Sequence, residues 1–202
     1  MSIGLLSLIV IALAVAGYLI GWRRALSVSG GDARKLHSLP GYYGQSVLLF
    51  TAVPALLTLG VWLIVQPMLI EARVIDMIPA ADVPEGSSAD LVMSDVRRIA
   101  LGLDVIVAQG KLTNDQLSTM RADLSDLRGR LAEVGVALGA NVRPSVLEAA
   151  KVYRSAAATG QWLMTGVVLA LALAGMAFAM SRIHRDFRAR NVSEAFVKSL
   201  LI

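Results

Sequence analysis

The chain has 202 residues, of which 56% are hydrophobic and 17% are charged, and its formal net charge is +4. Its mean hydropathy of +0.65 is too high for an ordinary water-soluble domain of this size, which carries more charged surface. The sequence contains no cysteine, which excludes disulfides and thiol chemistry.

The hydrophobic residues are concentrated in three runs that contain no Asp, Glu, Lys or Arg: Ile3–Trp22, Ser46–Ile70 and Trp162–Met180. Each is long enough to cross about 30 Å of hydrocarbon as a helix, at about 1.5 Å per residue. A helix also satisfies its own backbone polar groups, which lipid cannot do. We therefore predict an all-α integral membrane protein with three transmembrane helices.

The first run could instead be a cleaved signal peptide, but such peptides carry basic residues before the apolar stretch. Here nothing basic precedes the run, and Arg23 and Arg24 follow it directly. This arrangement favours a retained membrane helix.

The charges predict the topology. The loop 23–45 and the tail 181–202 each have a net charge of +3, whereas the segment 71–161 has −2. Basic residues in short segments beside membrane helices mark the cytoplasmic side. We expect the N-terminus and the segment 71–161 to lie outside the membrane. The loop 23–45 is expected inside, and the last segment 162–202 crosses the membrane and ends inside. Because the basic residues lie at membrane boundaries, a nucleic-acid-binding role is not expected.

The external segment 71–161 reads as a linker followed by an antiparallel helical hairpin. Ser87 or Ser88 can cap a first helix that reaches Gln109, and Thr113 with Gln116 forms a capping box for a second. Both helices have an apolar seam. In the first it is Val92, Val96, Ile99, Leu103 and Ile106; in the second it is Leu117, Met120, Leu124, Leu127, Leu131, Val134 and Leu138.

The 3–4 spacing of these seams is typical of coiled-coil packing. We expect the two seams to bury each other, with a partner-binding groove or an oligomeric coiled coil as alternatives. Pro144 suits the first turn of a further helix that continues into the last span. The hairpin contains no His or Cys, so we predict no catalytic residues, no metal ligands and no cofactor.

Small residues and prolines mark contacts within the spans. Gly17-x-x-x-Gly21 and Ala170-x-x-x-Ala174 would permit close helix approach, and Pro54 and Pro67 would bend the second span. None of the three runs carries Asp, Glu, Lys, Arg or His, so these helices are not expected to form a proton or ion pathway.

The two short basic segments supply the candidate cytoplasmic interface. In the loop RKLHSLPGYYG, Arg34 and Lys35 would lie at headgroup depth, and a turn at Pro40 leads to interfacial tyrosines. In the tail, the three-residue spacing of Arg182, Arg185 and Arg188 predicts one basic helix face suited to anionic lipid. The candidate residues are Arg34, Lys35, His37, Pro40, Tyr42, Tyr43, Arg185, Arg188 and Arg190.

Together, the loop Arg34–Gly44, the external insert and the exit FRARNVSEAFVKSLLI (Phe187–Ile202) resemble the amino-terminal extension of PstC-type permeases of bacterial phosphate ABC transporters. The resemblance implies that a permease core follows the extension and holds the substrate-binding residues. It also implies three partners: a second permease subunit, a cytoplasmic ATPase and a periplasmic phosphate-binding protein.

On this interpretation the chain is a structural and interaction region of a phosphate importer, neither an enzyme nor transport-competent alone. The alternative is a sensor or receptor fragment, in which two spans flank an extracytoplasmic helical bundle. A receptor would continue as a soluble heptad helix, whereas Ala195–Ile202 becomes apolar. A small membrane scaffold is a third possibility.

Overall fold

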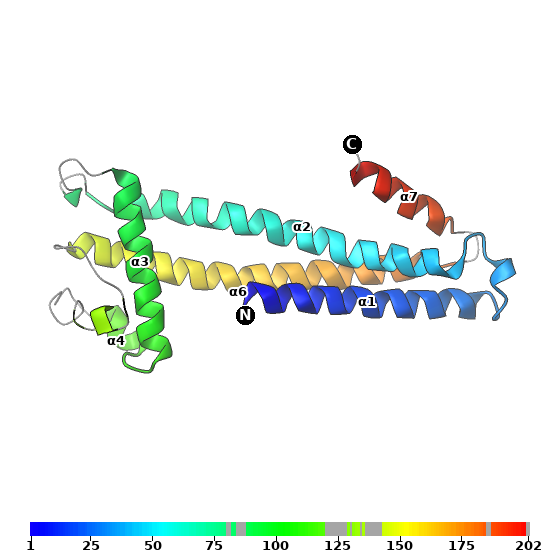
Figure 1. The fold of residues 1–202 in the computed structure, drawn as a ribbon, viewed down its shortest axis with the longest axis horizontal. Helices are drawn as coiled ribbons and strands as arrows, with labels where there is room; N and C mark the ends of the chain where they lie inside the picture. Colours follow the sequence, from blue (N-terminus) through cyan, green and yellow to red (C-terminus); the bar gives the residue numbers. More distant parts are fainter. Residues whose placement is uncertain are drawn as a thin grey trace. The chain divides into compact units, whose positions relative to one another are not determined.

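A computed structural model shows an all-helical chain (Figure 1). It describes residues 1–79, 82–83, 88–119, 129, 131–133, 135, 143–184 and 187–200, and no β-strand occurs among them. The helices are α1 (Ile3–Val28), α2 (Pro40–Ile75), α3 (Ala89–Ala108), α4 (Asn114–Thr119), α6 (Pro144–Ser181) and α7 (Ala189–Leu200), with a short 3-10 helix η1 (Ala33–Lys35).

The chain divides into two compact units. Unit 1 comprises residues 1–63 and 161–202, and unit 2 comprises residues 64–160. The helices α2 and α6 each contribute one part to unit 1 and the other part to unit 2.

Three helices, α1, α2 and α6, are long and apolar enough to cross a membrane, which confirms the three predicted membrane-spanning helices. Each extends beyond its uncharged run. The helix α1 continues past Arg23 and Arg24 to Val28, α2 reaches from Pro40 to Ile75, and α6 begins at Pro144. The linker expected from Glu71 therefore begins only after Ile75, because charged residues near a membrane boundary do not interrupt helical hydrogen bonding.

Local sequence signals account for both ends of α1. The Ser2 hydroxyl accepts a hydrogen bond from the Leu5 amide at 3.3 Å and so satisfies one of the free amides of the first turn. At the other end, Gly30 and Gly31 adopt φ values of 69° and 85°, and the Gly31 amide donates to the Leu26 carbonyl at 2.9 Å. Glycine suits this left-handed turn because it lacks a Cβ.

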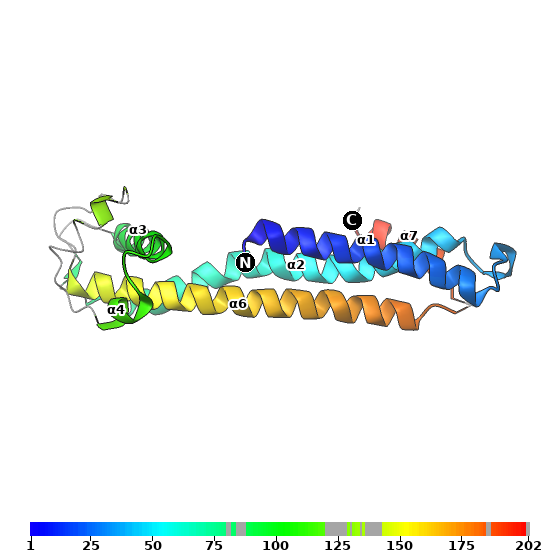
Figure 2. The same cartoon turned by 90° about the horizontal axis from the view of Figure 1, so that it is seen from below.

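In unit 1, α1 runs antiparallel to α2 and parallel to α6, as both views show (Figures 1 and 2). One apolar cluster joins all three helices through residues at helical spacing: Leu6 and Val10 of α1, Ala55 and Leu59 of α2, and Met164, Val168 and Ala172 of α6. The opposite faces of these helices leave large apolar side chains exposed, such as Leu8 at 62% and Leu57 at 65%. This distribution is what a helix with one face toward lipid requires, since lipid solvates apolar side chains.

In unit 2, α3 forms as the sequence predicts. The Ser88 hydroxyl caps it, its C-cap is Gln109, and Gly110 follows with φ 70°. All five predicted seam residues of α3 are buried, and four of them, Val96, Ile99, Leu103 and Ile106, are 0% exposed.

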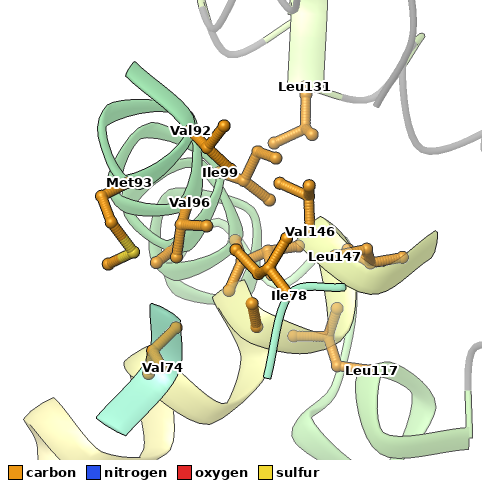
Figure 3. Close-up of a cluster of buried hydrophobic side chains, with 14 of the residues drawn as sticks. Val74, Ile78, Val92, Met93, Val96, Ile99, Leu117, Leu131, Val146 and Leu147 are labelled. Atoms are coloured by element: carbon orange, nitrogen blue, oxygen red, sulfur yellow. The ribbon is translucent and has the colours of Figure 1, made fainter. Parts of the chain in front are cut away.

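The core around the α3 seam contains residues from more segments than the predicted second hairpin helix. The cluster includes Val74 from the end of α2 and Val146 and Leu147 from the start of α6, together with Leu117 and Leu131 (Figure 3). The ends of α2 and α6 therefore share the burial of α3 with the second seam.

The second hairpin helix starts where the capping box predicts. The Thr113 hydroxyl accepts from the Gln116 amide at 3.2 Å, and the Gln116 side chain accepts from the Thr113 amide at 2.9 Å, just before α4. Leu117 and Leu131 of its seam are buried. The remaining seam positions, Met120, Leu124, Leu127, Val134 and Leu138, lie outside the described residues.

The α3 seam offers a test with two leucines on one helix. Leu103 is 0% exposed and Leu101 is 66% exposed. We expect Leu103→Ala to destabilise unit 2 by about 2–5 kcal/mol, because it leaves a cavity in the core. Leu101→Ala is the control and should cost less than about 0.5 kcal/mol. Hydrogen–deuterium exchange of the α3 amides in liposomes measures both; equal effects would contradict the assignment of the buried face.

Candidate functional site: the loop–exit junction

The helices α1 and α2 cross at glycines. A Cβ at Gly21 would lie 2.7 Å from Cγ2 of Val47, and a Cβ at Gly44 would lie 2.8 Å from the backbone oxygen of Tyr18. Gly17 also faces Val47, and a Cβ added there would lie 3.0 Å from Cγ1 of Val47. Small residues let helix backbones approach closely in a membrane, where dispersion contacts drive association. The Gly17-x-x-x-Gly21 motif is thus used as predicted.

The prediction of a close helix contact at the second small-residue motif, Ala170-x-x-x-Ala174, is wrong within this chain. Ala170 and Ala174 are exposed on α6, and the buried face of that helix carries Val168, Ala172 and Ala179 instead. Alanine spacing alone does not reveal which side of a helix meets its neighbours. The rotation of α6 is decided by the larger side chains that pack beside it.

Gly175 of α6 meets α2 at a carbonyl left free by proline. Pro54 has no amide hydrogen, so the Phe50 carbonyl four residues earlier lacks its usual helical donor. A Cβ at Gly175 would collide with this Phe50 oxygen. The helix α2 runs without interruption through Pro54 and Pro67. The glycine therefore allows the α6 backbone to cover the freed carbonyl.

One end of unit 1 joins the loop after α1 to the exit after α6, and we call this region the loop–exit junction. Its centre is Tyr43, which is 0% exposed although it is a tyrosine at a helix start. The Tyr43 hydroxyl donates a hydrogen bond to the Phe187 carbonyl at 3.0 Å, and the two rings lie 6.1 Å apart. Burial of the ring is tolerated because its polar end has a partner.

An apolar cluster lies beneath this hydrogen bond. Its buried members come from four segments: Ala25 of α1, Tyr43 and Val47 of α2, Ala179 and Ile183 around the end of α6, and Ala189 of α7. A second link closes the junction at its rim, where the Arg190 amide donates to the Ser38 hydroxyl at 3.4 Å. The junction thereby fixes the loop and the exit to each other within unit 1.

The structure places most predicted interface residues at this junction. Arg34 and Lys35 are exposed on η1, with the Asp32 carboxylate accepting from the Arg34 amide at 3.0 Å. His37 is exposed, Pro40 occupies the first position of α2, and Tyr42 is half-buried. Proline is favoured at that position because its missing amide would have no helical partner.

The basic segment after α6 does not form the predicted single basic helix face. Arg182 and Arg188 do not share a helical face, because α6 ends at Ser181 and α7 begins at Ala189. Both are exposed in the connection, and Arg182 stacks over the Phe178 ring at 5.0 Å. Arg185 lies outside the described residues. The arginine spacing of three matched a helix only by coincidence.

Arg190 is exposed on the first turn of α7 and pairs with Glu194 at 2.6 Å, one helical turn on. The hydrogen bond to Glu194 raises the pKa of the Arg190 guanidinium above its ordinary value, so the side chain stays charged. The described part of the junction is therefore an exposed cationic surface over a closed apolar contact.

The sequence did not predict the hydrogen bonds of Ser38 and of the Phe187 backbone carbonyl. Both belong to segments that the sequence singled out, but neither contact has a sequence signal. The Tyr43–Phe187 bond joins residues 144 positions apart. Only the packing of α6 against α2 brings them together.

Unit 2 holds a hollow of about 560 Å³ lined by residues of α3, α4 and α6. Its polar side chains already have partners. Arg154 contacts Asp104 at 2.6 Å and Asn114 at 2.9 Å, and Lys151 contacts Glu148 at 2.8 Å. Among the described residues no group of three or more His, Cys, Asp or Glu could hold a metal ion.

A family model described as phosphate ATP-binding cassette transporter matches residues 7–177. The chain belongs to this family. The match includes α2 and most of α1 and α6, the loop Arg34–Gly44 and the external segment, and it ends before α7. Searches of curated proteins and of solved structures returned no match. The phosphate transporter resemblance seen in the sequence is thus confirmed, and the protein is a multi-pass membrane protein of this transporter family.

The helix crossing of this transporter protein yields a paired test on α2. We expect Gly44→Ala to weaken the α1–α2 contact by about 1–3 kcal/mol, because the added methyl group meets backbone and ring atoms of Tyr18. Gly60→Ala is the matched control, since a Cβ at Gly60 has no neighbour within 4 Å. Thermal unfolding in nanodiscs measures the difference. Equal stability of the two variants would show that α1 and α2 do not cross at Gly44.

Proposed function

We propose that this chain is the N-terminal membrane region of a phosphate ABC importer permease subunit and serves structure and interaction rather than substrate conduction. The observation that carries the proposal is the family match across residues 7–177. The same match favours a transporter over the sensor or receptor alternative. A separate ATPase subunit would supply the energy for transport.

The loop–exit junction supports an interaction role. In the junction, α1, α2, α6 and α7 pack together around Tyr43. Arg34, Lys35 and His37 are exposed at its surface. A fixed framework with exposed cations is a suitable docking surface for another subunit, because charge at an interface rim directs association. The proposed partners on this side are the second permease subunit and the ATPase.

The proposed location is the bacterial inner membrane, with the N-terminus and unit 2 outside and the junction in the cytoplasm. The basic loop and tail support this orientation. Unit 2 would then face the periplasm, where a phosphate-binding protein delivers substrate.

Photo-crosslinking in cells tests the interaction role. The cross-linking amino acid p-benzoyl-phenylalanine, placed at exposed His37, is expected to form adducts with the ATPase or the second permease subunit, since the junction faces them. The same amino acid at exposed Asp95 of α3 is the matched control and should capture neither. Mass spectrometry identifies the adducts. Adducts with a signalling protein would support the sensor alternative, and the absence of any protein adduct at His37 would refute docking at this face.

The orientation is tested by labelling single cysteines, which the cysteine-free chain permits without background. We expect Asp95→Cys to react with a membrane-impermeant maleimide in intact cells. Ser27→Cys and Asn191→Cys, both at exposed positions of the basic side, should react only after the membrane is opened. The reverse pattern would invert the proposed topology.

A further inference from the structure

The helix α7 has two different faces. Ala189, Val192 and Phe196 follow one another at helical spacing of three and four residues, and none of the three is fully exposed. The opposite side carries Arg190, Asn191, Glu194 and Lys198, all exposed. Apolar residues on one face and basic residues on the other are typical of helices that lie in the plane of a membrane surface.

The position of α7 within unit 1 places it at such a surface. It begins eight residues after Ser181, the last residue of the membrane-spanning helix α6. Its first residue, Ala189, is buried among Ala25, Tyr43 and Ile183, which lie at the ends of the three spans. Beyond this first turn α7 diverges from the long helices (Figure 1). The helix therefore starts at the depth where acyl chains give way to headgroups.

The charges of the exit favour an anionic surface. The tail 181–202 has a net charge of +3. Arg188, Arg190 and Lys198 are exposed there, and among the described residues of α7 the one carboxylate, Glu194, forms a surface pair with Arg190. Such an exposed pair contributes little energy, so it does not prevent Arg190 from contacting headgroups.

We propose that α7 lies in the membrane–water interface, with Val192 and Phe196 among the acyl chains and Arg188, Arg190 and Lys198 against anionic phospholipid headgroups. This proposal requires only that α6 spans the membrane, and it holds for either orientation of the chain. The two faces of α7 contribute different parts: the apolar face sets the depth, and the basic residues set the preference for anionic lipid.

Spin labels at four single-cysteine positions of the full chain test the depth. In liposomes of phosphatidylcholine and phosphatidylglycerol, labels at Val192→Cys and Phe196→Cys are expected to be several-fold more accessible to oxygen than to a water-soluble nickel complex. Labels at Asn191→Cys and Lys198→Cys, on the opposite face, should show the reverse. Strong nickel accessibility at all four positions would place α7 in water. Shielding of Val192 and Phe196 from both reagents would mean that protein covers this face. Either result overturns the proposal.

The lipid preference is tested with the label at Phe196→Cys. We expect the ratio of membrane-immersed to water-exposed signal to fall when phosphatidylglycerol is omitted. It should also fall about fivefold for each cation removed in Arg188→Gln and Lys198→Gln. Arg98→Gln, at an exposed position of α3, is the control and should leave the ratio unchanged. The same ratio in pure phosphatidylcholine and in the charge variants would overturn the headgroup contact, while the first experiment would still report the depth of α7.

Discussion

The arrangement of unit 1 depends on the close approach of helix backbones at three glycines. Lipid is as apolar as the helices themselves, so the hydrophobic effect does not press one span against another. Cohesion must come from dispersion contacts, which need short distances. Gly21 and Gly44 allow α1 to reach α2, and Gly175 allows α6 to cover the Phe50 carbonyl that Pro54 leaves without a donor. Any side chain at these points would separate the helices and weaken the contacts around them.

The loop–exit junction follows from this close packing. With α1, α2 and α6 held together, the ends of the spans meet, and their apolar residues form a cluster that excludes water. Tyr43 can then be buried, because the backbone carbonyl of Phe187 accepts a hydrogen bond from its hydroxyl. A buried hydroxyl without a partner would be costly. The hydrogen bond therefore holds the backbone after α6 against the start of α2. The charged side chains of the loop after α1 and of α7 remain at the surface.

Unit 2 differs from unit 1 in the chemistry of its surface. Its seam residues are buried in an apolar cluster, and its charged residues form surface pairs such as Arg97–Glu71 at 2.9 Å. The apolar cluster draws on the end of α2, on α3 and on the start of α6. The helices α2 and α6 thus contribute residues to the apolar clusters of both units. The family match at residues 7–177 includes all of unit 2 and part of unit 1.

The sequence by itself determined the features that depend on neighbouring residues. Uncharged runs predict the spans, since length and hydrophobicity suffice to cross lipid. Ser88 and the Thr113–Gln116 pair predict helix starts, and the spacing of Val96, Ile99 and Leu103 predicts the buried face of α3. Each of these signals is read within a few turns of one helix, and the structure agrees at each position.

Tertiary structure alone decided the contacts between distant residues. Gly17-x-x-x-Gly21 meets another helix whereas Ala170-x-x-x-Ala174 is exposed, although the two motifs have the same spacing. The break after Ser181 and the Tyr43–Phe187 bond likewise have no local signal. The physical reason is that helical periodicity defines a face but not its rotation. Which face meets a neighbour depends on how large and small side chains from three helices fit together at once.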